Sequence, residues 1–367
     1  MRIAYDHQIF AWQEYGGISR YFFEVARRIN KFDGFDVSVV SPFYVNEYLG
    51  ADHSIKIWGK RLKRYPRPRR IAWKLNKALV WWKLHREIPD IVHETYYVAQ
   101  KLSSSKTRSI ITVFDMIHEK FPEGFPADDV TPQLKKAAIA RADHIICISE
   151  NTRRDLSDIL EVDPSRTSVI HLAPTALPEK EGECRPLTDR PYIAYVGLRA
   201  GYKNFSRLIG AFGISEFLRN NFSIVCFGGG EFTSVERQEI LRAGLMTERV
   251  IHASGGDDML KPIYRGAAAF VYPSLYEGFG IPPLEAMSVD CPVVVSNAGS
   301  LPEVCGNAAE YFDPYQPESI AAAIERVVRS TGRRKELIDL GTRQLGRYSW
   351  DACANRTAAV YRAVGSR

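Results

Sequence analysis

The sequence lacks any run of apolar residues long enough to cross a membrane, which takes about 18 in succession. It also lacks an apolar signal region, because the residues from Met1 to Tyr5 lead directly into strand-like sequence. With 45% hydrophobic and 25% charged residues, the composition is that of an ordinary globular protein. We therefore expect a protein that works in the cytoplasm.

Cysteine pairs are also absent. The six cysteines stand singly, without the C-x-x-C spacing of zinc sites and redox dithiols, so we interpret them as small buried apolar residues. The sequence contains no internal repeat and no G-x-G-x-x-G fingerprint after a strand. These absences argue against a repeat protein and against a dinucleotide-binding protein.

Acidic residues are missing from one stretch of the chain. Every charged residue from Lys56 to Arg86 is Lys or Arg, so this stretch carries the excess behind the net charge of +6. A local basic field attracts phosphates, anionic lipid or nucleic acid without choosing among them. No nucleic-acid motif accompanies the stretch, and we expect no nucleic-acid partner.

Short β-branched runs alternate with helical patterns along the whole chain. This alternation is typical of parallel sheets covered on both faces, so the predicted fold class is α/β. A chain of 367 residues exceeds the roughly 250 at which one core stops growing, so we expect two domains with a cleft between them. The predicted strands are 2–5, 36–41, 91–93, 109–114, 144–148, 192–196, 223–227, 268–272 and 292–296.

A polar stretch with several prolines divides the chain. We interpret residues 177–191 as a linker between an N-terminal domain, residues 1–176, and a second domain, residues 192–349. In parallel sheets of this kind, ligands bind outside the carboxyl ends of the strands. The loops that follow the strands therefore hold the candidate site residues.

The most informative loop is residues 273–287, which follows a predicted strand and contains Glu277 and Glu285 in an E-x7-E spacing. Pro283 suits the first position of a helix, which places Glu277 in the loop and Glu285 in the first helical turn. Glycines between them let a ligand approach the backbone N–H groups. Taken alone, the pattern also fits a plain strand-loop-helix connection.

Two further loops carry residues suited to anions. Arg199 and Lys203 follow the strand 192–196, where both can face an anion, Arg with a fork of N–H groups and Lys as a point charge. Two basic residues in a loop are also common on solvated surfaces. Gly16 and Gly17 precede a predicted helix, where such a pair forms either an anion site or only a turn.

The string P-S-L-Y-E-G-F-G-I-P-P-L-E-A-M at residues 273–287 resembles the retaining glycosyltransferases of family 4, whose E-x7-E motif encloses G-F-G-x-P. The segment V-G-L-R-A-G-Y-K-N at residues 196–204 and the glycine pair follow the order of that family, and the resemblance covers nearly the whole chain. It implies a GT-B fold, in which two Rossmann-like domains with parallel sheets face a central cleft. It also implies that the C-terminal helix, residues 350–367, crosses back to the first domain.

The resemblance implies a role for each motif. Glu277 holds hydroxyls of the donor sugar, and Glu285 holds those of the ribose. Arg199 and Lys203 neutralise the diphosphate, which stabilises the charge that develops on the departing phosphate. The other implied donor contacts are the backbone groups of Gly278, Phe279, Gly280 and Ile281, with the loop of Gly16 and Gly17 reaching across the cleft.

The implied reaction is transfer of a hexose, mannose or glucose in type, from a UDP- or GDP-sugar to a hydroxyl of a saccharide or lipid-linked saccharide acceptor. The anomeric configuration is retained, and the product belongs to a surface polysaccharide or glycolipid. The nucleotide sugar is a co-substrate, and no cofactor is implied. No metal is implied, because Arg199 and Lys203 take its place and no D-x-D motif ends a strand.

One departure from the family pattern concerns Asp115. Many members carry an H-D pair where this chain has Phe114 and Asp115, so the motif His is missing. Asp115 keeps its place as a candidate catalytic residue, although it also fits a cap of the following turn. His118 is a candidate to fill the space of the missing His.

Polar residues at three neighbouring strand ends, 93–97, 114–119 and 147–152, indicate one wall of the cleft. Within the last of them, Ser149 fits the N-cap of a helix better than a ligand contact.

The basic stretch, residues 56–86, leaves two interpretations open. The plain one is a helix that buries its apolar stripe in the domain core. In the other, exposed cations and tryptophans rest on an anionic membrane, each cation contributing about 1 kcal/mol. The protein would then be peripheral to the cytoplasmic face of the membrane. The apolar residues at helical spacing are Ile71, Leu75, Ala78, Leu79 and Trp82, and the tryptophans are Trp73 and Trp81.

Two other functions stay open. A nucleotide-sugar epimerase or a phosphorylase would share the fold and use no separate carbohydrate acceptor. A non-enzymatic nucleotide-sugar-binding protein would bind the donor and release no nucleotide.

Overall fold

The computed structural model describes residues 1–51, 54–179, 187–199 and 201–366. Residues 180–186 of the predicted linker, Ala200 and Arg367 lie outside this range. The fold is α/β, and the chain forms two compact units. Unit 1 comprises Met1–Lys120, Phe125–Leu172 and Ser349–Arg367, and unit 2 comprises Phe121–Gly124 and Ala173–Tyr348.

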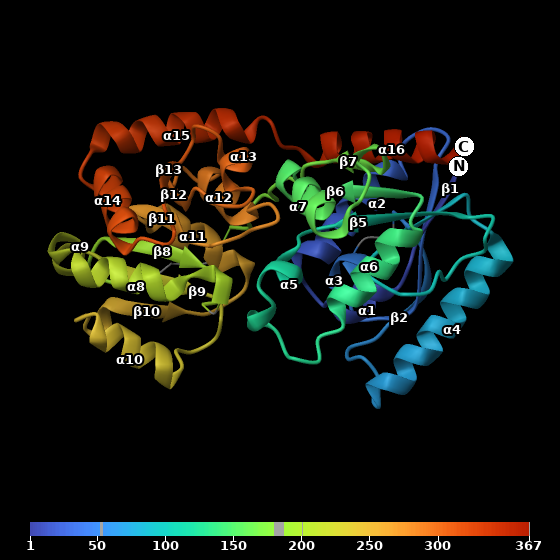
Figure 1. The fold of residues 1–367 in the computed structure, drawn as a ribbon, viewed down its shortest axis with the longest axis horizontal. Coiled ribbons are helices and arrows are strands. Elements are labelled where there is room, and N and C mark those ends of the chain that lie inside the picture. The colour runs from blue at the N-terminus through green and yellow to red at the C-terminus, as the bar shows by residue number, and fades with distance from the viewer. Residues whose placement is uncertain (52–53, 180–186, 200, 367) are drawn as a thin grey trace. The chain divides into compact units, whose positions relative to one another are not determined.

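Unit 1 is built on a parallel sheet of seven strands in the order β3-β2-β1-β4-β5-β6-β7 (Figure 1). The strand order reverses between β1 and β4, which pair with each other. Buried β-branched residues such as Ile110, Ile111 and Val113 of β5 fill the central strands. The strands are β1 Arg2–Tyr5, β2 Asp36–Tyr44, β3 Lys56–Arg61, β4 Ile91–Glu94, β5 Arg108–Val113, β6 His144–Cys147 and β7 Thr167–Val169.

The helices of unit 1 include one from the far end of the chain. In α16, the Tyr361 hydroxyl lies 2.7 Å from the hydroxyl of Tyr5 on β1 and 2.6 Å from Nδ1 of His93 on β4. These buried contacts fasten α16 to the sheet. The helices are α1 Gln8–Trp12, α2 Gly17–Ile29, α3 Glu47–Ala51, α4 Arg69–Glu87, α5 Ile117–Lys120, α6 Thr131–Arg141, α7 Glu150–Leu160 and α16 Trp350–Gly365, with the 3-10 helix η2 Pro164–Arg166.

Unit 2 repeats the same topology with a parallel sheet of six strands in the order β10-β9-β8-β11-β12-β13. The order again reverses once, between β8 and β11. The strands are β8 Tyr192–Val196, β9 Ser223–Phe227, β10 Val250–Ala253, β11 Ala269–Tyr272, β12 Val293–Ser296 and β13 Glu310–Phe312.

Helices α8 and α14 pack against each other in unit 2, and a cluster of buried apolar side chains joins both to the sheet. The helices are α8 Phe205–Ile214, α9 Glu216–Asn221, α10 Ser234–Arg242, α11 Leu260–Gly266, α12 Ile281–Met287, α13 Leu301–Cys305, α14 Pro317–Val328 and α15 Thr331–Leu345. The 3-10 helices are η1 Pro122–Gly124, η3 Gly201–Lys203, η4 Thr247–Arg249 and η5 Asp257–Met259.

The structure confirms all nine predicted strands, with ends that differ by at most three residues. It also contains four strands that were not predicted: β3, β7, β10 and β13. These four are the edge strands of the two sheets. An edge strand has a neighbour on one side only and is often short or polar, so its apolar pattern is weak.

Helix α4 buries a different face from the one that the apolar stripe predicted. The buried residues are Ala72, Asn76, Val80 and Leu84, whereas Ile71, Leu75 and Trp82 are exposed by 64%, 49% and 47%. Asn76 faces inward because β2 is irregular between Val40 and Phe43. There the Asn76 amide accepts from the Phe43 N–H over 3.1 Å and donates to the Phe43 carbonyl over 3.0 Å. The plain interpretation of the stripe as core is therefore wrong.

The sequence predicted buried cysteines and no membrane-spanning segment. Five of the six cysteines lie within the described range, and all five are buried as predicted. No helix of the described residues is long and apolar enough to span a membrane.

Candidate functional site

The point where each sheet reverses its strand order is the natural place for a ligand. Chain segments leave such a point in opposite directions, which opens a crevice beyond the carboxyl ends of the two strands. In unit 2 the two loops at this point are residues 197–204, after β8, and residues 273–280, after β11. These loops contain most of the predicted donor-binding residues.

Lys203 and Glu277 meet at this point of unit 2. The Lys203 ammonium donates to Glu277 Oε1 over 2.7 Å and to the Tyr272 hydroxyl over 3.1 Å. Burial by itself would lower the pKa of Lys203, but Tyr272 and Glu277 raise it well above its usual value. The lysine is therefore charged at neutral pH. The resemblance assigned Lys203 to the diphosphate of the donor and Glu277 to its sugar, and in the structure the two side chains form an ion pair.

Backbone contacts hold the loop that carries Glu277. The Asn204 amide donates to the carbonyl of Pro273 over 2.9 Å, from the left-handed conformation that Asn tolerates. On the other side, the Ser300 hydroxyl lies 2.9 Å from the carbonyl of Glu277 and 2.7 Å from that of Phe279. The Glu277 carboxylate is thus presented from a backbone that is fixed on both sides.

The helix after this loop begins earlier than predicted. It begins at Ile281 because Gly280 takes a left-handed φ of 105°, and the prolines then occupy positions whose N–H groups have no helical partner in any case. Glu285 consequently lies in the second turn, and the prediction that it stands in the first turn is wrong. Its carboxylate is buried, with Oε2 at 3.5 Å from the Tyr264 hydroxyl.

The backbone groups of Gly278, Phe279, Gly280 and Ile281 remain predicted donor contacts. Only the backbone of Phe279 can serve a ligand, because its ring is buried edge-to-face against Tyr348 at 5.6 Å. At position 280 an added Cβ would lie 2.7 Å from a side-chain carbon of Leu301. Both packing and φ therefore require the glycine there.

The Arg199 side chain forms its hydrogen bonds with other residues of unit 2. Its Nε donates to Glu236 Oε1 over 2.8 Å, and its terminal N–H groups donate to the four backbone carbonyls of residues 228–231. The guanidinium lies over the Phe232 ring at 4.6 Å, and the side chain is only 2% exposed. In this arrangement Arg199 is a positioning residue that holds the loop after β9. Its contact with a diphosphate stays a prediction.

The glycine pair lies in unit 1, where α2 begins at Gly17. At position 16 an added Cβ would lie 2.3 Å from the Gln13 side-chain oxygen, so packing requires Gly16. At position 17 it would meet no described atom within 4 Å. The Ser19 N–H in the same first turn already donates to the Gln13 side-chain oxygen over 3.2 Å. Contact of the glycine pair with a donor phosphate stays a prediction.

Asp115 and His118 both make contacts within unit 1. Asp115 Oδ1 accepts from the N–H of Ile117 over 3.0 Å, which is the turn cap that the sequence left open as the plain alternative. Nδ1 of His118 lies 2.6 Å from Asp129 Oδ2, and its ring stacks on Phe125 at 3.8 Å. A catalytic role for either residue stays a prediction.

The polar strand ends do not all form an open wall. His93 and Glu94 are buried because β4 is a central strand covered on both faces, and Glu94 forms an ion pair with Arg141. Burial lowers the pKa of His93 to about 3. Ser149 caps α7 as predicted, with its hydroxyl accepting from the N–H of Thr152 over 3.0 Å.

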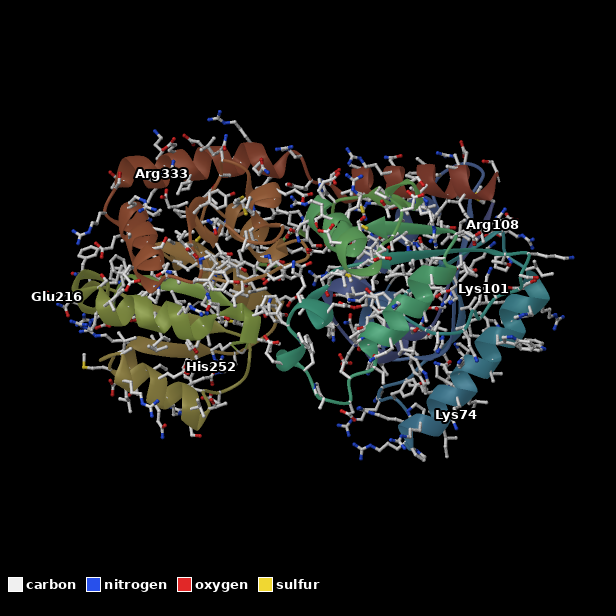
Figure 2. All side chains as sticks on the ribbon, in the orientation of Figure 1. Lys74, Lys101, Arg108, Glu216, His252 and Arg333 are labelled. Atoms are coloured by element: carbon white, nitrogen blue, oxygen red, sulfur yellow. The ribbon has the colours of Figure 1, made fainter. Side chains whose placement is uncertain are left out.

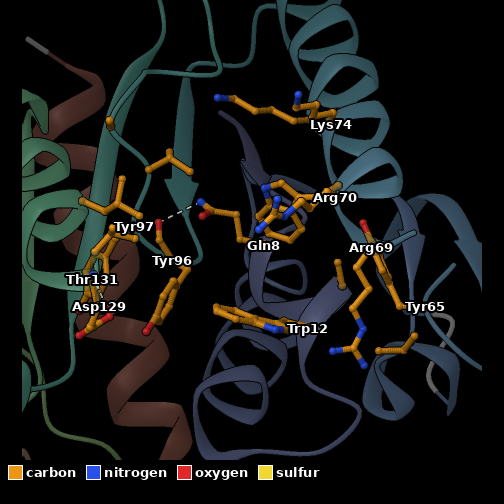
Figure 3. A pocket seen from close by; sticks show the side chains of 18 of the residues that line it. Gln8, Trp12, Tyr65, Arg69, Arg70, Lys74, Tyr96, Tyr97, Asp129 and Thr131 are labelled. Atoms are coloured by element: carbon orange, nitrogen blue, oxygen red, sulfur yellow. Dashed lines mark hydrogen bonds between the residues drawn. The ribbon is translucent and has the colours of Figure 1, made fainter. Parts of the chain in front are cut away.

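A cavity of about 1250 Å³ lies in unit 1 beside its own point of strand reversal (Figure 3). Gln8 and Trp12 line it after β1, and Tyr96 lines it after β4. The Gln8 amide donates to Asp6 Oδ2 over 2.7 Å and to the Tyr96 carbonyl over 2.9 Å. Tyr96 belongs to the strand end 93–97 that was predicted to form a wall of the cleft, whereas Gln8 and Trp12 were not predicted. The polar triplet D-H-Q directly after the first strand is a signal for Gln8.

The two points of strand reversal differ in chemistry. In unit 2, a charged ammonium beside a fixed carboxylate suits a ligand that has both an anion and hydroxyl groups. In unit 1, the cavity is rich in cations and aromatic rings. Within the described range, no three side chains of His, Cys, Asp or Glu gather closely enough to hold a metal ion.

Two family models match the chain. Residues 15–173 match the model described as Glycosyltransferase Family 4, and residues 179–344 match the model described as Glycosyl transferases group 1. O-antigen chain mannosyltransferase B of Escherichia coli is 28% identical over 310 residues, which are 80% of this chain and 77% of that protein. O-antigen chain mannosyltransferase RfbU of Salmonella typhimurium is 29% identical over 228 residues, which are 59% of this chain and 60% of that protein.

Solved structures show the same fold. Anabaena Alr3699/HepE in complex with UDP-glucose superposes with a TM-score of 0.73 at 16% identity, covering 99% of this chain and 100% of the other. WaaG, a glycosyltransferase involved in lipopolysaccharide biosynthesis, superposes with a TM-score of 0.69 at 14% identity, covering 98% and 99%. The architecture is therefore the GT-B type, with two Rossmann-like units.

Proposed function

Because the chain belongs to the glycosyltransferases of family 4, we propose that it transfers a hexose from a nucleotide-diphosphate sugar to a hydroxyl of a saccharide acceptor. The proposed hexose is mannose or glucose in type, and the proposed outcome is retention at the anomeric carbon. The proposed product belongs to a surface polysaccharide or glycolipid. Both mannosyltransferases compared above act on O-antigen chains by name, which supports this product class.

The ion pair of Lys203 and Glu277 carries the proposal. It lies where an open parallel sheet receives a ligand, and it offers the two groups that a nucleotide sugar needs. We infer that Lys203 turns to the diphosphate and stabilises the charge on the departing phosphate. Glu277 then accepts from hydroxyls of the transferred sugar, and Glu285 from those of the ribose.

The remaining predicted residues have supporting roles in the proposal. Arg199 positions the loop after β9 at the donor site, and the N–H groups at Gly16 and Gly17 bind a donor phosphate. The backbone groups from Gly278 to Ile281 contact the sugar and phosphate. No metal takes part in the proposed reaction, since the ammonium of Lys203 supplies the positive charge.

The donor can be identified by thermal unfolding with UDP-, GDP- and ADP-sugars, because a ligand that binds only the native state raises the melting temperature. We expect a UDP- or GDP-sugar to raise it, and Glu285→Ala to reduce the shift. The proposal fails if no nucleotide sugar changes the melting temperature.

Product analysis separates the proposed reaction from the alternatives. A transferase releases nucleotide much faster when an acceptor is present than by slow hydrolysis of the donor alone. NMR of the product gives the anomeric configuration. An epimerase would convert the donor without an acceptor, and a phosphorylase would require phosphate or form a sugar phosphate. Donor binding with no turnover for any acceptor would favour a binding protein.

We also propose that the outer face of α4 rests on an anionic membrane surface, which brings lipid-linked acceptors within reach. Ile71, Leu75 and Trp82 form an exposed apolar stripe there, and the basic residues of the same helix supply charge complementarity. Figure 2 labels Lys74, which lies on the same helix and lines the cavity of unit 1. A location of the protein at the membrane surface is part of this proposal.

Vesicle flotation tests this contact. We expect the protein to float with vesicles of phosphatidylglycerol and phosphatidylcholine, and Leu75→Glu to reduce the bound fraction about tenfold. Leu241→Glu is the matched control, because Leu241 is also an exposed leucine, 60% against 49% for Leu75, and lies on α10 of unit 2. Equal binding of the two variants would refute the contact.

A further inference from the structure

The cavity of unit 1 has an unusual charge. Seven of its lining residues are Lys or Arg, all between Lys63 and Lys77, against three carboxylates. Within the described part of the chain, none of these seven side chains has a carboxylate partner. Their neighbours outside the cavity do, since Arg61 pairs with Glu47 and Lys83 pairs with Glu87. The cavity therefore gathers seven cations whose charge no neighbouring carboxylate of the described residues neutralises.

The start of α4 strengthens this positive field. Arg69 and Arg70 occupy its first turn, which contains no acidic residue. The N-terminus of a helix carries a partial positive charge, so cations in the first turn are unfavourable there unless an anion joins them. Both arginines line the cavity. A bound anion would relieve their mutual repulsion and the repulsion from the helix together.

The opposite wall is aromatic. Figure 3 shows Tyr96 across the cavity from Arg70 and Lys74, with Gln8 and Trp12 between them. The Trp12 ring is 65% exposed and meets Tyr96 edge-to-face at 5.8 Å. Exposed flat rings of this kind can pack against the C–H face of a sugar.

A buried histidine lies behind this wall. His7 is 1% exposed, its ring lies 4.9 Å from that of Trp73, which lines the cavity, and neither ring nitrogen has a hydrogen-bond partner among the described residues. Burial lowers the pKa of His7 to about 4, so the ring is neutral at pH 7. The positive charge of the cavity therefore comes from its Lys and Arg side chains.

We propose that this cavity binds the acceptor, and that the acceptor is a glycosyl phosphate or diphosphate. Its phosphoryl oxygens face Arg70, Lys74 and Lys77, and its sugar rests against Trp12 and Tyr96. The cavity exceeds the usual 300–1000 Å³ of a small-molecule site, so it has room for a sugar and its phosphate. The proposal rests on the proposed transferase function and names the acceptor class for it.

The test compares two acceptors that differ only in the phosphate: decyl mannosyl phosphate and decyl mannoside. Binding to the full chain is measured by calorimetry without donor, and transfer is measured at saturating donor. We expect the phosphorylated acceptor to bind at least tenfold more tightly. The double variant Arg70→Gln with Lys74→Gln should lose most of this preference and leave the KM of the donor and of decyl mannoside unchanged.

Lys83→Gln is the matched control, because Lys83 lies on the same helix outside the cavity, and it should keep the preference. As a second variant, Trp12→Ala should weaken both acceptors alike. Equal affinity of the wild-type protein for the two acceptors would overturn the proposal, as would an equal loss for both in the double variant. Mannose 1-phosphate, which lacks the tail, assigns the source: weaker binding than decyl mannosyl phosphate indicates a lipid-linked acceptor, and equal binding a free sugar phosphate.

Failure of the proposed function would look different. If no nucleotide sugar binds unit 2, the transferase proposal fails while the calorimetry of the cavity still gives an answer. If donor is turned over and the phosphate makes no difference, the transferase proposal stands and the acceptor class is wrong.

Discussion

Lys203 and Glu277 lead to a prediction at the scale of single residues. Under the proposed function the ammonium gains most when charge develops on the departing phosphate, so it acts on the transition state more than on the bound donor. We expect Lys203→Ala to lower kcat about a hundredfold, with a much smaller change in the KM of the donor. Steady-state kinetics measures this, with Lys261→Ala as the control, since Lys261 pairs with Glu179 in the same unit.

A rise in KM with an unchanged kcat would contradict this role of Lys203. Such a result would mean that the lysine binds the donor equally in the ground state and in the transition state.

Arg199 leads to the opposite prediction, because its contacts are with the protein. Arg199→Lys keeps the charge and loses most of the contacts with the carbonyls of residues 228–231 and with Glu236. We expect the free energy of unfolding to fall by about 2 kcal/mol, measured by urea denaturation. A variant with wild-type stability and weakened donor binding would instead favour a direct contact with the diphosphate.

The sequence predicted the loops that hold these residues better than their partners. The motifs predicted that Lys203 and Glu277 belong to one site, because each follows a strand of the same sheet. They did not predict that Arg199 is held by Glu236, which is distant in sequence and comes close only through packing of the loop after β9. Gln8 was missed because a polar residue after a strand is common and its neighbour Tyr96 follows a different strand, β4.

At the scale of elements, two buried histidines make stability depend on pH: His93, which α16 covers, and His7, which lies beside Trp73 of α4. Burial lowers the pKa of His93 to about 3, and burial lowers that of His7 to about 4. The unfolded chain binds a proton on each near pH 6.5, and the native protein does not, so stability is lost as the pH falls from about 6.5 towards 4. Each histidine contributes up to ~1.4 kcal/mol per pH unit.

Urea denaturation at pH 7 and pH 5 measures this loss, and His93→Gln should remove about half of it. Equal stability of the wild-type protein at the two pH values would show that neither histidine is kept neutral by the fold.

The elements also show where sequence patterns fail. The central strands were predicted because burial on both faces demands apolar residues throughout, whereas the four edge strands have no such demand. Helix α4 was predicted, but its buried face was not, because Asn76 faces inward to satisfy the backbone of an irregular β2. The hydrogen bonds of one polar residue thus decide which face of α4 packs on the sheet. The apolar stripe of the helix stays exposed as a result.

At the scale of the whole molecule, unit 1 depends on residues that follow unit 2 in the sequence. We expect a chain that ends at Tyr348 to lose stability in unit 1, because Tyr5 and His93 lose the Tyr361 hydroxyl and a buried surface becomes exposed. Hydrogen exchange measures this by unit: β1 and β4 should exchange faster, and β8 and β11 should not. Equal acceleration in both units would contradict this dependence.

The place of α16 also has a consequence for synthesis. Apart from Phe121–Gly124, unit 2 is the continuous segment Ala173–Tyr348, so it can fold as soon as this segment has left the ribosome. Unit 1 is made first, but the helix that covers Tyr5 and Tyr21 is made after all of unit 2. The first unit to be translated is therefore the last to be completed, and it needs protection from aggregation for that interval.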